Sequence, residues 1–331
     1  MSLFQSEVRR VETLDLDAFP LGTTTRCALG VVHDGAGDMI RVPVLVARGS
    51  VPGPVLGITA AVHGNEVNGI PVIQKLFGGL DSSTLRGTVI GCPIMNMPAY
   101  LSNTREMNYE FDINRLMPGR PDGNAGEVYA HRLCSRLLHC FEYLIDLHTA
   151  SFGRTNSLYV RADLGDETTR SMARLQQPEI IVHNEPRDGT FRGAADELGI
   201  PAITVEVGNP QRFEPARIRD SLLGVKNVLA QLGMIDHEIA VVGEEPVVCE
   251  RSHWLFAEHG GLLEVFPGLT DRLCKGDRIA RVSNVFGDIL AEYVAPADGI
   301  VVGRATNPVC QTGARMLHLG VPQASSRPGM R

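Results

Sequence analysis

The chain contains the run Pro54-Val-Leu-Gly-Ile-Thr-Ala-Ala-Val62, and His63-Gly-Asn-Glu66 follows it directly. A short, nearly continuous apolar run bounded by turn-forming residues is typical of a strand buried on both faces of a parallel sheet. Apolar side chains then recur at helical spacing from Ile70 to Phe77. Pro71 lacks a backbone donor, so we expect this helix to start late or to kink. The stretch predicts a strand, a polar turn and a helix of an α/β sheet.

The same alternation of strands and helices continues to about residue 235. We expect further buried strands at 87–93, 142–147, 179–183 and 201–207, and helices at 127–140 and 218–232. A hairpin precedes them, with strands at 25–33 and 39–48 around Asp34-Gly35. This order indicates an α/β domain with a mostly parallel sheet flanked by helices.

The character of the chain changes near residue 240. Turn-forming Gly-Asp, Pro-Gly and Asp-Gly pairs separate short β-like segments at 240–242, 246–249, 261–266, 278–282, 289–293 and 299–302. These segments indicate a small all-β domain. We therefore expect an α/β domain at 1–238, an all-β domain of the barrel-sandwich type at 239–322, and a frayed tail at 323–331.

The composition places the chain among globular proteins, since 44% of its 331 residues are hydrophobic and 21% are charged. The 38 acidic residues outnumber the 31 lysines and arginines, and the net charge of −7 disfavours nucleic acid as a partner. No apolar run approaches the roughly 18 residues that a membrane helix needs, and the N-terminus lacks the pattern of a signal peptide. The seven cysteines form no CxxC pair. We therefore expect a cytoplasmic protein with reduced, mostly buried thiols and no membrane partner.

Candidate metal ligands follow two of the predicted strands. His63 and Glu66 lie three residues apart on a turn that enters a helix, and both are residue types that bind zinc. His148 lies on the same side of its strand as Asp146, so it suits a third ligand that Asp146 orients. The alternatives are a capped helix start with a hydrogen-bonded His63, and a core histidine at 148 that the neighbouring aspartate satisfies.

Two further groups of polar residues are candidates for the chemistry. Glu206 lies at the end of an apolar strand, where it suits a general base; the alternative is a structural ion pair. The polar loop at 103–119 contains Arg105, Asn114 and Arg115. Guanidinium groups bind carboxylates through paired hydrogen bonds, so this loop suits a carboxylate ligand; the alternative is a solvated surface loop.

Four motifs occur in a fixed order along the chain. They are His63-Gly-Asn-Glu66, Asp112-Ile-Asn-Arg-Leu-Met-Pro-Gly119, Asp146-Leu-His148 and Ile203-Thr-Val-Glu-Val-Gly208. Together they resemble the succinylglutamate desuccinylase/aspartoacylase family of zinc carboxypeptidase-like hydrolases. The resemblance runs from about residue 50 to 210, and the downstream β domain is also similar.

The resemblance implies a zinc carboxypeptidase-like fold and one Zn²⁺ per chain, held by His63, Glu66 and His148. It also implies that Glu206 is the base and proton shuttle of the reaction.

The resemblance further implies the roles of three residues in the polar loop. Asn114 and Arg115 would bind the carboxylate of the substrate, and Arg105 would stabilise the tetrahedral oxyanion. The C-terminal segment at 279–301 is similar to a biotinyl/lipoyl-type fold, but no lysine occurs after Lys275 to carry a cofactor. We therefore expect this domain to be a lid or an assembly module.

These observations together predict a zinc-dependent amidohydrolase that removes the acyl group from an N-acyl amino acid or a related small acylated compound. A metallocarboxypeptidase acting on short peptides would use the same residues. A non-catalytic metal- or ligand-binding protein is the alternative from another class. The expected partner is a small acylated substrate, and assembly into a homo-oligomer is compatible with the sequence.

Overall fold

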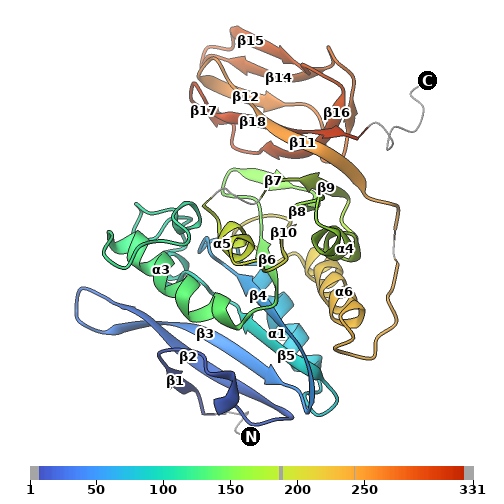
Figure 1. The fold of residues 1–331 in the computed structure, drawn as a ribbon. Coiled ribbons are helices and arrows are strands. Elements are labelled where there is room, and N and C mark those ends of the chain that lie inside the picture. The colour runs from blue at the N-terminus through green and yellow to red at the C-terminus, as the bar shows by residue number, and fades with distance from the viewer. Residues whose placement is uncertain (1–6, 186–188, 242, 324–331) are drawn as a thin grey trace, which may run out of the picture.

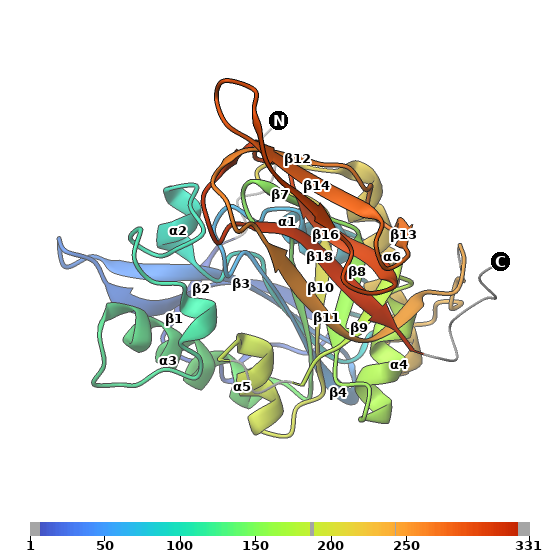
Figure 2. The ribbon, with the colours of Figure 1, turned by 90° about the horizontal axis from the view of Figure 1, so that it is seen from above.

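The computed structural model describes residues 7–185, 189–241 and 243–323. Helices cover both faces of a central sheet, and a β-rich part formed by the end of the chain lies over one end of that sheet (Figure 1). Figure 2 looks down on the β-rich part and shows it above strands of the α/β part. The two parts are joined by strand pairing, because β7 (Arg154–Asn156) pairs with β16 (Gly299–Ala305).

The α/β part contains most of the helices. Its other strands are β1 (Arg9–Val11), β2 (Thr23–His33), β3 (Met39–Arg48), β4 (Val51–Ala60), β5 (Arg86–Cys92), β6 (Tyr143–His148), β8 (Leu158–Ala162), β9 (Ile180–His183) and β10 (Ala202–Val207). Its α-helices are α1 (Gly69–Gly79), α2 (Met97–Leu101), α3 (Ala125–Leu137), α4 (Glu167–Leu175), α5 (Phe191–Glu197) and α6 (Pro215–Gln231). The other strands of the β-rich part are β11 (Val247–Phe256), β12 (Gly261–Val265), β13 (Arg272–Leu273), β14 (Arg278–Ser283), β15 (Ile289–Val294), β17 (Val309–Cys310) and β18 (Arg315–Pro322).

Within the described residues, one 14-stranded sheet has the order β1-β2-β3-β5-β4-β6-β10-β8-β9-β11-β18-β16-β13, with β7 attached to β16. The neighbours β5, β4, β6 and β10 run parallel, whereas β8 runs antiparallel to β10. A separate antiparallel sheet has the order β15-β14-β12-β17. The mixed α/β fold and the antiparallel C-terminal sheet agree with the fold class expected from the sequence.

The register of the parallel strands brings the predicted site residues to one edge of the sheet. In the pairing of β4 with β6, Thr59 lies beside Asp146, and in the pairing of β6 with β10, His148 lies beside Glu206. Because parallel strands end at the same edge, the turns after β4 and β6 meet there. Three motifs that are distant in the sequence therefore become neighbours.

Separate hydrophobic cores hold the layers together. One core packs α3 and α5 against one face of the sheet, and another packs α1, α4 and α6 against the opposite face. A third core fills the β-rich part. A small cluster that includes Tyr159, Ile180, Cys249 and Ile300 joins residues from before and after the expected boundary at 238/239. The domain limits remain a prediction, because the sheet continues across them.

Several expected elements differ in detail from the observed ones. The helix after β4 does not start late, because Pro71 lies in the first turn of α1, where its missing backbone donor is not needed. The expected strand at 240–242 is wrong for Ala240 and Val241, which lie outside any strand, and residue 242 lies outside the described residues. The expected tail also falls outside them from residue 324 onward. The hairpin at 25–33 and 39–48 is confirmed as β2 and β3.

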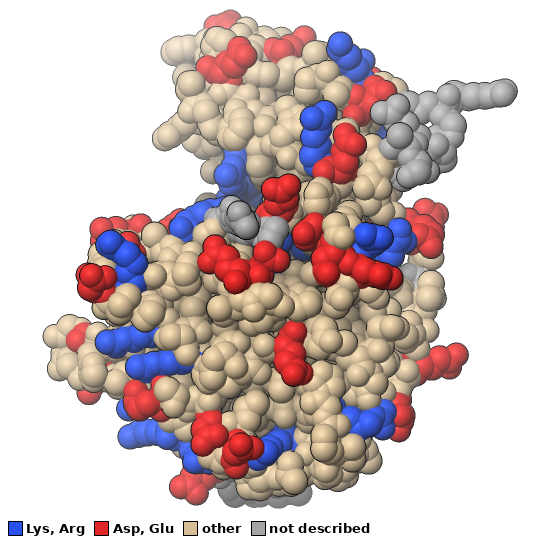
Figure 3. Space-filling model, in the orientation of Figure 1, with Lys and Arg blue, Asp and Glu red and all other residues tan. Residues whose placement is uncertain are grey.

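The state of the cysteines and the distribution of surface charges are compatible with the expectations drawn from the composition. All seven cysteines are free, and only Cys274 is exposed. Acidic and basic side chains are interspersed on the face drawn in Figure 3. None of the helices in the described residues is both long enough and apolar enough to span a membrane.

Candidate metal centre and active site

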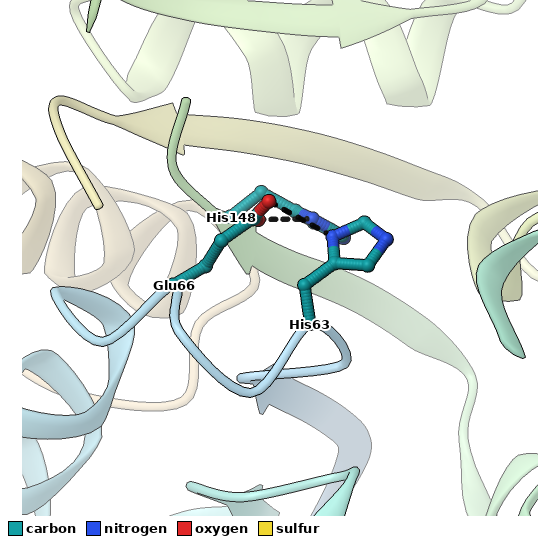
Figure 4. Close-up of side chains that lie close together, drawn as sticks. All are labelled: His63, Glu66 and His148. Atoms are coloured by element: carbon teal, nitrogen blue, oxygen red, sulfur yellow. Dashed lines mark hydrogen bonds and ion pairs between the residues drawn. The ribbon is translucent and has the colours of Figure 1, made fainter. Parts of the chain in front are cut away.

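Two histidines and a glutamate converge at the carboxyl ends of β4 and β6. The carboxylate of Glu66 lies between the two imidazoles (Figure 4), with one oxygen 3.0 Å from His63 Nδ1 and the other 3.0 Å from His148 Nδ1. The candidate ligand atoms of the three residues all lie within 4.8 Å of one another, and all three residues are buried. This group can hold a metal ion.

An aspartate orients each histidine by contacting its Nε2 atom, whereas Glu66 contacts the Nδ1 atom of each ring. The Nε2 atom of His148 lies 2.9 Å from Asp146 Oδ2, and the hydroxyl of Thr59 donates to the other oxygen of Asp146 at 2.6 Å. The Nε2 atom of His63 lies 3.1 Å from Asp112 Oδ1. An ionised carboxylate only accepts hydrogen bonds, so each Nε2 carries a proton toward its aspartate, and a bound metal would take the Nδ1 side of each ring in place of any proton there. This arrangement is typical of zinc-binding histidines, and the residues present therefore fit the ion.

The charges in this cluster are strongly coupled. Burial alone would raise the pKa of Glu66, but the charges and hydrogen bonds of His63 and His148 outweigh it and place that pKa well below the usual range. Burial would likewise lower the pKa of His148, but Asp146 and Glu66 raise it well above its usual value. The carboxylate at 66 is therefore ionised and available as a ligand.

Arg105 lies beside the cluster and connects it to the polar loop. Its Nη1 atom lies 3.1 Å from Glu66 Oε1 and also approaches the Ser151 hydroxyl, while its Nη2 atom donates to Asp112 Oδ2 at 2.9 Å. Burial would lower the pKa of Arg105, but Glu66 and Asp112 raise it. A fixed positive charge therefore lies within hydrogen-bond distance of a candidate metal ligand.

Glu206 lies in the same cavity, and two side chains position it. The amide of Asn156 donates to Oε2 at 3.2 Å, and the hydroxyl of Tyr159 donates to Oε1 at 3.3 Å. Arg161 Nε lies 4.0 Å from the same Oε1 atom. Burial is the main cause of the raised pKa of Glu206, and the nearby charge of His148 opposes it. A raised pKa enables a carboxylate to accept and hold a proton, as a general base must.

Asn114 and Arg115 lie on a short 3-10 helix at Ile113–Arg115 and line the same cavity. The side-chain oxygen of Asn114 accepts a hydrogen bond of 2.8 Å from the backbone N–H of Phe191, which leaves the amide nitrogen for a ligand. Arg115 is exposed. The structure therefore places all seven residues that were predicted from the sequence around one cavity.

The cavity has a volume of about 110 Å³. Several residues of its wall were not predicted from the sequence. These are Ser151, Arg154, Asn156, Tyr159, Arg161, Thr190, Arg192, Thr204, Trp254 and Arg315 among others. The alternation of Tyr159 and Arg161 in β8 was the available signal for part of them, since residues two apart share a face of a strand.

Comparison with known proteins yields both a family and close structural neighbours. Residues 52–232 match the family model described as the succinylglutamate desuccinylase/aspartoacylase catalytic domain. The chain is 28% identical over 287 residues to a Halomonas elongata protein named N-alpha-acetyl-L-2,4-diaminobutyric acid deacetylase, over 82% of this chain and 83% of that protein. It is 27% identical over 170 residues to a succinylglutamate desuccinylase of Pseudomonas aeruginosa, over 47% of this chain and 51% of that protein.

Solved structures share the fold over nearly the whole chain. The product-bound structure of the ectoine utilization protein EutE (DoeB) from Ruegeria pomeroyi has a TM-score of 0.83 and 24% identity, and it covers 92% of this chain and 98% of that chain. A succinylglutamate desuccinylase/aspartoacylase from Rhodobacter sphaeroides has a TM-score of 0.84 and 24% identity, with 95% and 99% covered. The shared architecture therefore includes the β-rich part.

Proposed function

The chain belongs to the succinylglutamate desuccinylase/aspartoacylase family, and we propose on this basis that it is a zinc-dependent amidohydrolase that cleaves the amide bond of an N-acyl amino acid. The convergence of His63, Glu66 and His148 beside Glu206 in one arginine-lined cavity carries the proposal. The names of the two relatives also support it, since both describe removal of an acyl group from an amino acid.

His63, Glu66 and His148 would hold one Zn²⁺, because their Nδ1 and carboxylate atoms face one another while Asp112 and Asp146 fix the imidazoles. The ion would polarise an acyl carbonyl and lower the pKa of a water molecule.

Glu206 takes a proton from the attacking water and returns it to the nitrogen of the leaving amine. Its raised pKa supports this role, because a base must be able to hold the proton between the two steps. Asn156 and Tyr159 keep the carboxylate in place through hydrogen bonds to its two oxygens. The expected losses from removing such a base are about 10²- to 10⁴-fold in rate.

The remaining predicted residues bind and polarise the substrate. The guanidinium of Arg115 and the amide nitrogen of Asn114 bind the α-carboxylate of the amino acid. The Nη1 atom of Arg105 lies next to Glu66, where it can donate to the oxyanion that forms on the acyl carbon.

The small volume of the cavity, about 110 Å³, favours a small substrate over a peptide. Trp254 and Arg315 from the β-rich part line the wall of the same cavity as His63 and Glu206. A metallocarboxypeptidase needs a cleft that is open to a chain, so this wall disfavours that activity. A purely non-catalytic role leaves the ordered carboxylate of Glu206 without a purpose.

The test is hydrolysis by the purified, Zn²⁺-loaded protein of a panel of N-acetyl, N-succinyl and N-formyl amino acids, with dipeptides as the comparison. We expect release of free amine from at least one N-acyl amino acid, loss of this activity on chelation and its return with Zn²⁺. Faster cleavage of the dipeptides, or activity that chelation leaves unchanged, would contradict the proposal.

A further inference from the structure

Asn68 is a buried polar residue beside the candidate metal group that the proposed reaction does not use. It follows the candidate ligand Glu66 by two residues and stands at the N-cap position of α1, with its side chain fully buried. An asparagine at this position usually accepts a hydrogen bond from its own helix, but the side chain of Asn68 forms no such cap. Its polar atoms bind another part of the chain.

Both ends of the Asn68 amide bind the segment that follows β10. The amide nitrogen donates to the carbonyl of Val207 at 2.8 Å and lies 3.2 Å from Glu214 Oε2. The amide oxygen accepts from the backbone N–H of Glu214 at 3.0 Å. Val207 directly follows the candidate base Glu206, and Glu214 directly precedes α6. One side chain therefore ties the turn at 63–66, called the metal turn below, to the strand that carries the base.

The segment that Asn68 binds is itself held in a fixed shape. The carboxylate of Glu214 accepts from the backbone N–H of Asn209 at 2.6 Å and from the side-chain amide of Asn209 at 2.7 Å. In the same segment, the backbone N–H of Gln211 donates to the carbonyl of Asn65 in the metal turn at 2.9 Å. The attachment point of Asn68 is therefore closed by its own hydrogen bonds.

Gly69, the first residue of α1, fixes the same region against the neighbouring strands. A Cβ atom at this position would lie 2.7 Å from the Cβ atoms of both Ala60 and Leu147, so an alanine would force α1 away from β4 and β6. These strands lead into the two histidines of the candidate metal group, and β10 is the next strand in the sheet (Figure 1). Asn68 and Gly69 together therefore contact all three strands whose ends carry the site.

We propose that Asn68 is a positioning residue, which sets the place of the metal turn relative to Glu206 through its hydrogen bond to Val207. This inference rests on the proposed function, because it concerns the alignment of the base with the metal group. The side chain of Asn68 does not line the catalytic cavity, so it acts through the two segments that it joins. A displacement of about 1 Å between reacting groups can cost about 10²-fold in rate.

The first test compares Asn68→Ala with the matched control Asn227→Ala. Asn227 is an equally buried asparagine of α6, and its amide also forms three hydrogen bonds, to the backbone of Leu175 and Ala240, away from the cavity. Both variants should lower the denaturant midpoint by similar amounts. Only Asn68→Ala should lower kcat, by about 10- to 100-fold, with KM changed by less than about threefold. An equal kcat in the two variants would refute the proposal.

A second pair of variants covers the case in which alanine at position 68 prevents folding. Asn68→Ser introduces another favoured N-cap residue, which can cap α1 itself but is too short to reach both Val207 and Glu214. Gly69→Ala moves the start of α1 independently, and Gly78→Ala in the same helix is its control, since a Cβ atom there meets nothing within 4 Å. Asn68→Ser and Gly69→Ala should lower kcat and Gly78→Ala should not. A normal kcat in Asn68→Ser would contradict the proposal.

A double-mutant cycle distinguishes alignment of the base from a general loosening of the fold. If Asn68 acts by aligning Glu206, its removal costs little once the base itself is absent. The kcat of the Asn68→Ala/Glu206→Gln double variant should therefore lie within about threefold of that of Glu206→Gln alone. Two losses that multiply would refute the link between Asn68 and the base.

Release of zinc to a chromogenic chelator provides a readout that does not depend on turnover. Because Asn68 holds the turn that carries two of the candidate ligands, Asn68→Ala should release Zn²⁺ at least about 10-fold faster, and Asn227→Ala should release it at the rate of the unchanged protein. If release is faster but the unchanged protein cleaves no amide, the proposed function fails and the positioning of the metal turn stands. If amides are cleaved and Asn68→Ala keeps its kcat, the positioning role is refuted.

Discussion

Replacement of Glu206 by glutamine separates the proposed base from the rest of the site. The two side chains have nearly the same shape, and the amide oxygen of glutamine can still accept a hydrogen bond from Tyr159 or Asn156. One hydrogen bond is lost, which costs about 1 kcal/mol, but a buried negative charge is removed as well. The free energy of unfolding should therefore change by no more than about 1 kcal/mol.

The effect on the reaction should be far larger than the effect on stability. An amide cannot take the proton of the attacking water, so we expect kcat to fall by about 10²- to 10⁴-fold, equal to about 2.7 to 5.4 kcal/mol of lost transition-state stabilisation. KM should change little, because Glu206 does not bind the carboxylate of the substrate. The zinc content should also be unchanged, because Glu206 is not part of the ligand group.

The assay combines three measurements on the same preparation: amine release over a range of substrate concentrations, zinc by elemental analysis, and unfolding by denaturant. Glu264→Gln provides the control, since this glutamate lies on the surface of the β-rich part and pairs with Arg281. A kcat within about threefold of the unchanged protein would refute the assignment of the base, given the expected magnitude. A parallel loss of zinc would instead show that Glu206 acts on the metal site.

Three further outcomes can be measured on the same protein. His63→Ala or His148→Ala should leave less than about a tenth of the zinc bound, as expected when a ligand is removed, and full metal content in both by elemental analysis would refute the ligand set. Arg115→Ala should raise KM for N-acyl amino acids by about 10- to 150-fold, and Arg115→Lys should recover little, because an ammonium cannot form paired contacts; steady-state kinetics with an unchanged KM would make Arg115 structural. Burial holds the pKa of His318 well below its usual value. As the pH falls below about 6.5, this imidazole therefore takes up a proton in the unfolded chain but not in the folded one. The free energy of unfolding should then fall by about 2 kcal/mol more between pH 7 and 5 than in His318→Gln, and denaturant curves with the same pH dependence for both would refute this.

The candidate ligands were predictable from the sequence because their signals are local. His63 and Glu66 are three residues apart, and Asp146 and His148 are two apart, so the geometry of one turn or one strand decides whether they can face the same point. The parallel order of the strands then brings the two pairs together. The hairpin at 25–33 and 39–48 was predictable for the same reason.

The wall formed by Arg154, Trp254 and Arg315 was not predictable, since its members are separated by up to 161 residues, the difference between positions 154 and 315. They meet because β7 pairs with β16 and β11 pairs with β18, and neither pairing leaves a periodic signal in the sequence. The role of Asp112 was hidden for a similar reason. Its contact with His63 crosses 49 residues and depends on how the polar loop folds back.

The joint between the two parts determines how the molecule would respond to a cut in its backbone. The connection between α6 and β11 includes exposed residues such as Glu238, Val241 and Glu244, where a protease can reach the chain. Cleavage there would leave β11 hydrogen-bonded to β9, and β16 hydrogen-bonded to β7. The nicked polypeptides would stay together as one particle. Two fragments produced separately would each expose unpaired strand edges at this joint, and those edges would guide their reassembly into a complete enzyme.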